Sequence, residues 1–166
     1  MRLIVCDTGP ILHLKEAKLL NLLKKAGTIY IPSMVDIEIN EISSAWEKQK
    51  PDWLNVETLS PNETMQAESL YLSGLLDFGE AEAIILAKRL KPEWFLTDDT
   101  EARILAKSLG MEVHGSLGIV LWSAAIGHFS YTESINALDS LSKTSLWISK
   151  DILSQAQKAL KTIFDK

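Results

Sequence analysis

The sequence predicts an α/β fold built on a parallel sheet, and two observations lead to that prediction. Short apolar runs at residues 3–6, 28–31 and 94–97 are typical of strands buried on both faces. Amphipathic helix patterns separate these runs along the chain, so the first two runs form a strand–helix–strand unit. Strands joined by such a crossover helix lie parallel to each other.

Length and composition indicate one ordinary globular domain. The 166 residues are 46% apolar and 23% charged, and they contain no repeat, low-complexity tract or clear linker. We therefore expect residues 1–166 to form a single domain, with helices at about 131–166 packed against the rest.

Cysteine and charge content limit the compartment and the class of protein. Cys6 is the sole cysteine, which excludes an internal disulfide framework and favours the reducing cytoplasm. The apolar run after Arg2 is too short for a signal peptide, and no segment is long enough to span a membrane. The net charge of −5 argues against a general nucleic-acid coat protein. An enzyme that acts on nucleic acid stays possible, because acids that bind a divalent metal make the formal charge negative.

The first strand, residues 3–6, ends at Asp7 and the turn Thr8-Gly9-Pro10. An amphipathic helix follows at residues 11–26, with a pattern that allows a break near Lys15, and Gly27 stops it. Pro32 and Ser33, after the second strand, open the next helix. The later elements are expected in chain order as a connection at 46–60 with a short strand at 53–56, helices at 64–76 and from 77 onward, a strand at 94–97, a helix at 100–109, a brief edge strand at 111–113, and helices at 118–126, 131–141 and 149–164.

Two acids stand out in the first half of the chain. Asp7 comes at the end of a predicted central strand, where open α/β sheets bind their ligands, although Asp is also a good N-cap for the next helix. Glu38 shares the apolar stripe of its helix with Val35 and Ile39, where an acid is costly unless it is paired or bound to metal. The alternative is that Glu38 marks the solvated edge of that stripe.

Five further acids stand out between residues 77 and 99. Asp77 and Glu80 have the spacing of a capping box, and Glu82 points to roughly the opposite side of the same helix from Glu80. Because capping gives Glu80 a structural role, helix geometry favours Glu82 as the site residue. Asp98 and Asp99 follow a buried strand, and a helix cap accounts for one of them but not for both.

These acids suggest a metal centre. The carboxyl ends of parallel strands lie together, so Asp7 and Asp99 can be neighbours, with Glu38 and Glu82 on flanking helices. Four carboxylates in one pocket repel each other unless a cation lies among them, and oxygen ligands without Cys or His select Mg²⁺ or Mn²⁺. Such a centre activates water for attack on a phosphodiester.

Five motifs together resemble the PIN domain, and more specifically a bacterial and archaeal branch related to the VapC toxins. The resemblance covers essentially the whole chain. The motifs are Asp7-Thr8-Gly9-Pro10, residues 32–38 (PSMVDIE), residues 79–84 (GEAEAI), Thr97-Asp98-Asp99 followed by Arg103, and the closing Gly110, Gly115-Ser116-Leu117-Gly118 and Leu146-Trp147-Ile148-Ser149.

This resemblance implies a three-layer α/β/α fold, a Mg²⁺- or Mn²⁺-dependent ribonuclease centre, frequent homodimerisation and inhibition by a small antitoxin protein. By motif position, the catalytic metal ligands are implied to be Asp7, Glu38, Glu82 and Asp99, with Glu80 and Asp98 as alternatives. The sequence departs from the commonest pattern by having Glu in place of Asp at the third position.

Two other functions compete with the nuclease. A phosphatase built on Asp7 would require a second Asp two residues later, where this chain has Gly9. A phosphotransfer receiver domain would require paired acids near the first strand and a Lys at the end of a late strand, and neither is evident. A catalytically weak PIN-like scaffold would act by binding a partner protein.

Overall fold

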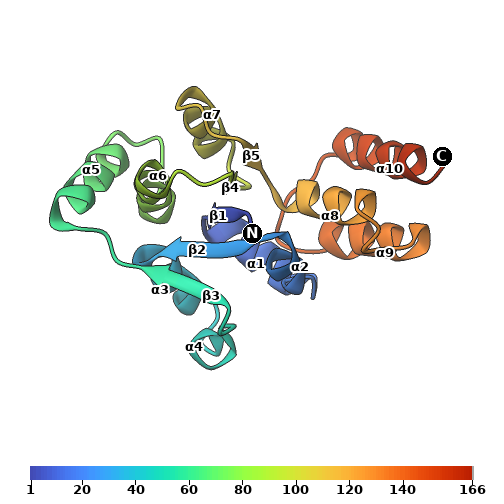
Figure 1. The fold of residues 1–166 in the computed structure, drawn as a ribbon, viewed down its shortest axis with the longest axis horizontal. Helices are drawn as coiled ribbons and strands as arrows, with labels where there is room; N and C mark the ends of the chain where they lie inside the picture. The colour runs from blue at the N-terminus through green and yellow to red at the C-terminus, as the bar shows by residue number, and fades with distance from the viewer. Residues whose placement is uncertain (166) are drawn as a thin grey trace.

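The computed structural model describes residues 1–165 and contains a five-stranded, all-parallel sheet between layers of helices (Figure 1). The strands lie in the order β3-β2-β1-β4-β5. Their bounds are β1 Leu3–Cys6, β2 Thr28–Pro32, β3 Leu54–Glu57, β4 Trp94–Leu96 and β5 Val113–His114. Each predicted strand is confirmed, with shifts of one or two residues at the ends.

Strand β1 occupies the centre of the sheet because it can be buried on both faces. Ile4 pairs with Ile29 of β2 on one side and with Trp94 of β4 on the other. Ile4, Val5 and Cys6 are all completely buried. The uninterrupted apolar run is therefore the signature of a strand with neighbours on both edges and helices on both faces.

Helices cover both faces of the sheet, which makes the fold a three-layer α/β/α sandwich. Val5 and Phe95 point to one face and pack under α5, α6 and α7. Ile4 and Leu96 point to the other, toward α1, α2, α3 and α8, with α9 and α10 joining the same core. The helices of this region are α1 Thr8–Glu16, α2 Asn21–Ala26, α3 Ser33–Ile42, α4 Trp46–Gln49, α5 Pro61–Leu72, α6 Phe78–Leu90, α7 Thr100–Ser108, α8 Ser116–Ala125, α9 Tyr131–Ser142 and α10 Lys150–Phe164.

The helix predicted at residues 11–26 is two helices. Helix α1 starts earlier, directly after Asp7, which serves as its N-cap. Between α1 and α2 the backbone of Lys18 adopts a left-handed conformation with φ of 62°. The break that the pattern allowed near Lys15 is thus confirmed, and it lies slightly later, at residues 17–20.

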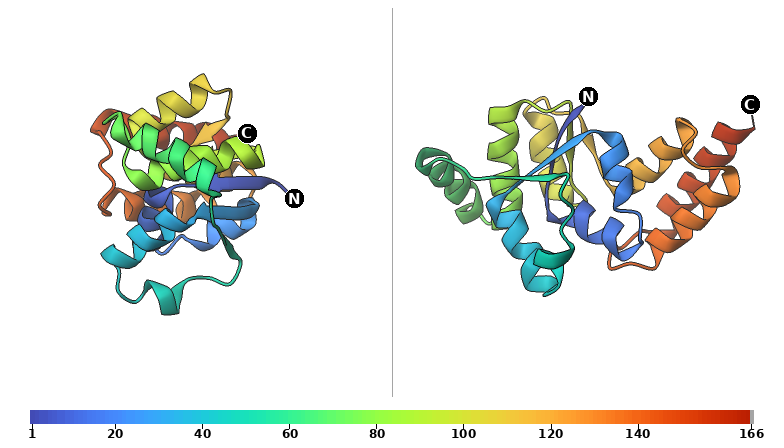
Figure 2. Two further views of the ribbon diagram at one scale, coloured as in Figure 1. Left: turned by 90° about the vertical axis from the view of Figure 1, so that its left-hand side faces the viewer. Right: turned by 60° about the horizontal axis from the view of Figure 1, so that its bottom comes forward.

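The C-terminal part of the chain forms a group of three helices, α8, α9 and α10, that pack on one another beside the sheet (Figure 2). The segment between α9 and α10 is tied back to α1, because Ser145 donates from its backbone N–H and its hydroxyl to the Glu16 carboxylate at 2.9 and 2.6 Å. Within residues 1–165, no helix combines the length and the apolar character that crossing a bilayer requires.

Candidate active site

The order of the strands creates a crevice at the carboxyl ends of β1 and β4. From β1 the chain builds β2 and β3 on one side, whereas β4 and β5 are added on the other side. The two neighbouring strands are joined at their ends, since the Asp7 N–H donates to the Leu96 carbonyl oxygen at 3.0 Å. Open α/β sheets bind ligands at such a switch point, where the chain changes from building one side of the sheet to building the other.

A cavity of 260 Å³ occupies this crevice, and most of its lining is acidic. The lining residues are Asp7, Thr8, Gly9, His13, Asp77, Glu80, Asp98 and Asp99. Five of these eight residues are acids, and they come from the ends of β1 and β4 and from the start of α6. The structure therefore brings together Asp7, Glu80, Asp98 and Asp99 from the predicted candidates and adds Asp77.

Asp7 is both a helix cap and a buried acid of the cavity. Its side chain is 2% exposed, and its Oδ1 accepts the Gly9 N–H at 3.2 Å at the start of α1. Burial raises the pKa of the Asp7 carboxyl well above its usual range; a hydrogen bond from Thr97 lowers it, and the charges of Asp98 and Glu80 raise it further. The two interpretations of Asp7 from the sequence are thus compatible.

Glu80 likewise combines capping with a place in the cavity. Asp77 Oδ1 accepts the Glu80 N–H at 2.8 Å, and Glu80 Oε2 accepts the Asp77 N–H at 3.1 Å, which completes the predicted capping box. Burial, followed by the charge of Asp77, raises the pKa of Glu80 to about 8. The lining of the cavity therefore holds five carboxyl groups and no lysine or arginine side chain to balance their negative charge.

Glu82 lies outside the cavity, against the start of α3. Its side chain is 7% exposed, and its Oε1 accepts the Met34 N–H at 3.2 Å. The sequence argument for Glu82 assumed that it has no structural partner, and that assumption is wrong. Capping one end of α3 gives Glu82 a structural role, while α6 directs Glu80, on its other side, toward the strand ends.

The neighbouring acids Asp98 and Asp99 have different partners. Asp99 caps α7, where its Oδ2 accepts the Ala102 N–H at 2.8 Å. The Asp98 carboxylate is engaged by three groups: the Ser116 N–H at 2.7 Å, the Ser116 hydroxyl, and His13 Nδ1 at 2.7 Å. Asp98 thus links the end of β4 to α8 and α1, whereas the Asp99 carboxylate caps the start of α7.

Glu38 borders the cavity without lining it. Its Oε2 accepts the Thr8 hydroxyl at 2.6 Å, and its Oε1 accepts the Gly79 N–H at 2.9 Å. A Cβ atom at position 79 would collide with the Glu38 carboxylate, so glycine is what allows α6 to approach so closely. Glu38 reaches the cavity only through Thr8, one of its lining residues.

The chemistry of these donors fits a hard divalent cation. The lining acids offer only carboxylate oxygens, and Glu80 and Asp99 each use one oxygen in a cap, which leaves the other for a ligand. Within residues 1–165, however, no three His, Cys, Asp or Glu side chains already stand close enough to form a finished metal site. A cation would have to draw the side chains together.

Without metal, the protein should lose stability as the pH rises from 4.5 to about 8, the ordinary and the raised pKa of Glu80. In that range the folded state keeps a proton that the unfolded state has released, so the free energy of unfolding falls with pH. Glu80→Gln should flatten this dependence in thermal unfolding measured in EDTA. Glu68→Gln, at an exposed position on α5, should leave it unchanged. If stability fell with pH equally steeply in Glu80→Gln and in the wild type, the raised pKa of Glu80 would be contradicted.

Sequence reasoning missed two lining residues, His13 and Asp77. Asp77 was interpreted only as a cap, and His13 was given no role. The available signal was helical spacing: His13 lies one turn after Gly9, and a Cβ atom at position 9 would stand 3.6 Å from His13 Cε1. A helix that begins at Asp7 therefore carries His13 on the cavity side.

Comparison with known proteins agrees with this geometry. No curated protein matches the sequence. A family model described as a PIN domain matches residues 3–162, which includes every strand and all the acids of the cavity. This match favours a nuclease-type fold over the phosphotransfer alternative built on Asp7. The chain belongs to the PIN domain family, whose members are generally metal-dependent nucleases.

Proposed function

We propose that this chain is a divalent-metal-dependent endoribonuclease that hydrolyses phosphodiester bonds in RNA. One observation carries the proposal: five acids from three separate segments line one cavity at the switch point of the sheet. Burial raises the pKa of both Asp7 and Glu80, as expected of carboxyl groups arranged for a cation.

In this proposal Asp7, Glu80 and Asp99 would hold Mg²⁺ or Mn²⁺. The bound ion would supply an activated water and would stabilise negative charge on the phosphate. The helix caps fix the orientation of these three carboxylates, because each side chain is tied to the backbone at a helix start. Asp98 accepts a hydrogen bond from His13 Nδ1, which leaves His13 Nε2 as the ring atom available to substrate or water.

Cleavage of single-stranded RNA with Mg²⁺, Mn²⁺ or EDTA tests the proposal, and two variants make it specific. Glu80→Gln should reduce metal-dependent cleavage at least about tenfold, the effect of a weakened metal ligand. Glu82→Gln should cleave like the wild type, because the glutamine carbonyl can still accept the Met34 N–H.

Two outcomes would refute this assignment. Cleavage that persists in EDTA would show that the reaction requires no metal ion. A larger loss of cleavage in Glu82→Gln than in Glu80→Gln would make Glu82 the metal ligand instead. Failure to cut with any metal would favour the alternative of a catalytically weak scaffold that binds a partner.

We also propose the finer biological role on the sequence resemblance to VapC-like proteins: a toxin of a type II toxin–antitoxin pair, active as a homodimer and inhibited by a small antitoxin protein. The motifs that support this role include the segments around Asp7, Glu80 and Asp99. A small open reading frame beside the gene would support it against a housekeeping nuclease.

A further inference from the structure

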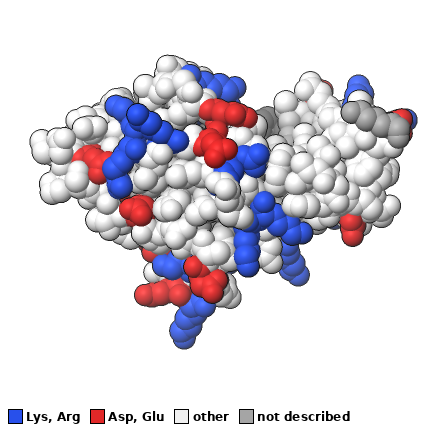
Figure 3. Space-filling view, in the orientation of Figure 1, with Lys and Arg blue, Asp and Glu red and all other residues white. Residues whose placement is uncertain are grey.

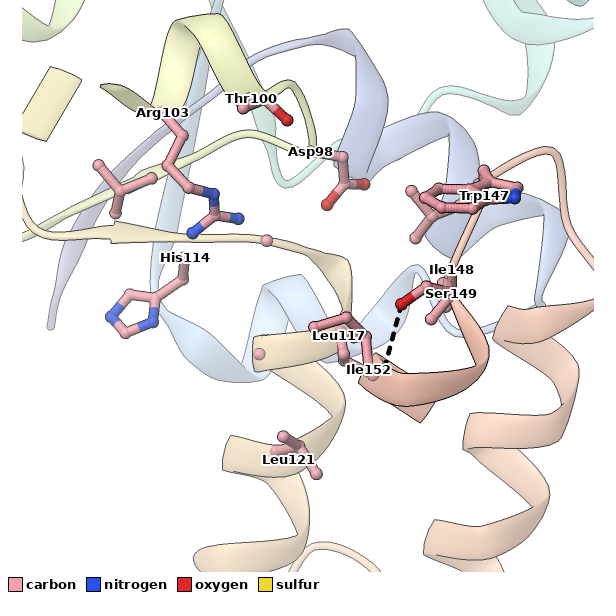
Figure 4. Close-up of a pocket in the computed structure, with 14 residues that line it drawn as sticks. Asp98, Thr100, Arg103, His114, Leu117, Leu121, Trp147, Ile148, Ser149 and Ile152 are labelled. Atoms are coloured by element: carbon pink, nitrogen blue, oxygen red, sulfur yellow. Dashed lines mark hydrogen bonds between the residues drawn. The ribbon is translucent and has the colours of Figure 1, made fainter. Parts of the chain in front are cut away.

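A second hollow, of 490 Å³, adjoins the acidic cavity (Figure 4). It is formed by α7, β5, α8 and the segment at residues 146–149 that leads into α10. Asp98 lines both hollows, so a ligand in the second one would lie beside the proposed catalytic acids. Its volume falls within the roughly 300–1,000 Å³ usual for pockets that bind small organic groups.

The two sides of this hollow, which we call the Trp147 groove, differ in chemistry. Figure 4 shows Arg103 and His114 on one side, Trp147 and Ile148 on the other, and Leu117 between them. One wall is therefore basic and rich in hydrogen-bond donors, and the other is aromatic. Between them lie the apolar Leu117 and the Asp98 carboxylate, which Ser116 and His13 already engage.

Trp147 is exposed although its segment is held in place. The indole is 84% exposed, an unusual position for the largest apolar side chain. The segment is anchored on one side by the hydrogen bonds of Ser145 to Glu16, and on the other by Ser149, whose hydroxyl accepts the Ile152 N–H at 3.1 Å. A flat aromatic surface held open to solvent is the kind of platform on which nucleobases stack.

Arg103 supplies positive charge on the opposite wall. One guanidinium nitrogen donates to the Thr97 carbonyl oxygen at 3.2 Å, and Arg103 takes part in none of the ion pairs within residues 1–165. Since a guanidinium has five N–H donors, most of them remain for a ligand. Gly115 keeps this wall open, because a Cβ atom there would lie 2.8 Å from the Arg103 guanidinium.

The face of the molecule shown in Figure 3 offers no broad basic field that could replace this local site. Acidic and basic side chains alternate over the face shown in Figure 3, and the net charge of the chain is −5. An RNA strand would thus be held by a few contacts near the acids rather than by general attraction.

We propose that the Trp147 groove binds one nucleotide of a single-stranded RNA, with the base stacked on Trp147 and a phosphate oxygen bound by Arg103. The statement that this nucleotide flanks the cleaved bond rests on the proposed nuclease function. The binding itself does not, because base stacking and guanidinium–phosphate contact require no metal.

Binding measured in EDTA therefore tests the groove separately from cleavage. The probe is a labelled single-stranded RNA of about ten nucleotides, within the usual span of such sites. Trp147→Ala should weaken binding on the order of tenfold, and Trp147→Phe should stay within about threefold of the wild type, because both aromatic rings can stack. Arg103→Gln should weaken binding and lower the slope of log affinity against log salt by about one. Leu72→Ala, at a 73% exposed position on α5, is the control and should change nothing.

Tryptophan fluorescence gives an independent readout. RNA should quench the wild-type emission, and Trp147→Phe should lose most of the quench while keeping its affinity, although four other tryptophans remain from the total of five. If Trp147→Ala bound RNA with wild-type affinity, the Trp147 groove would not be the binding site, even if cleavage depends on Asp7. If double-stranded RNA bound as tightly as single-stranded RNA, and this binding also depended on Trp147, stacking of an unpaired base would be excluded. A shift of Trp147 emission with protein concentration alone would assign the surface to a second copy of the chain instead.

Discussion

Asp7→Asn should abolish RNA cleavage and leave the protein at least as stable as the wild type above neutral pH. Asparagine keeps the oxygen that accepts the Gly9 N–H and is as good an N-cap as aspartate. It also removes a buried carboxyl whose pKa burial raises, so folding no longer has to bury that charge. The same change removes the negative oxygen nearest the centre of the sheet, which the proposed metal requires.

The expected loss of cleavage is at least about 100-fold, the upper end of what weaker perturbations around metal sites cost. Cleavage rates with Mn²⁺ and melting temperatures at pH 8 should be measured on the same preparations. Asp52→Asn, an equal charge change at an exposed position, is the matched control. A variant that cuts RNA at the wild-type rate would refute the metal centre, and a variant that melts far below the wild type would show that Asp7 acts mainly as a structural cap.

Asp98→Ala should cost about 2–4 kcal/mol of unfolding free energy, the largest stability effect among the acids of the cavity. The Asp98 side chain is 8% exposed, and its removal leaves Ser116 and His13 without their acceptor. At about 2–4 °C per kcal/mol for a chain of this size, the melting temperature should fall by roughly 5–15 °C. Thermal unfolding followed by circular dichroism measures this shift.

Asp99→Ala provides the comparison within the same pair of acids. It loses one cap hydrogen bond to Ala102, worth about 1 kcal/mol, yet it should eliminate most cleavage. The two neighbours would then divide into a structural acid and a catalytic acid. The reverse pattern, with Asp99→Ala unstable and Asp98→Ala folded but inactive, would exchange their roles.

The fold was predictable because its strands are short and separated by helices, and because the central strands β1 and β4 are apolar throughout. Val5 and Phe95 have no polar neighbours in their runs, and burial on both faces leaves no other interpretation of such runs. The exact position of the break between α1 and α2 was less accessible, because it depends on the left-handed backbone at Lys18, a residue type with no preference for that conformation.

The candidate site was predictable in its position but not in every residue. Strand ends predicted Asp7 and the Asp98–Asp99 pair, since parallel strands bring their carboxyl ends together. The choice between Glu80 and Glu82 could not be made from helix periodicity. It depends on which neighbour each face of α6 meets, and the approach of Met34 to Glu82 is a contact between segments nearly fifty residues apart.

The pairing of β1 with β4 also determines when activity can arise during synthesis. Ile4 pairs with Trp94, so one edge of the central strand stays open until the ribosome has made the chain well past its midpoint. At about 5–20 residues per second, that interval lasts several seconds. Asp7 is translated first, and it gains Asp98 and Asp99 as neighbours only after β4 has docked. A chain that ends before β4 therefore lacks one side of the acidic cavity, and the full set of lining acids exists only once residues up to 99 have joined the fold.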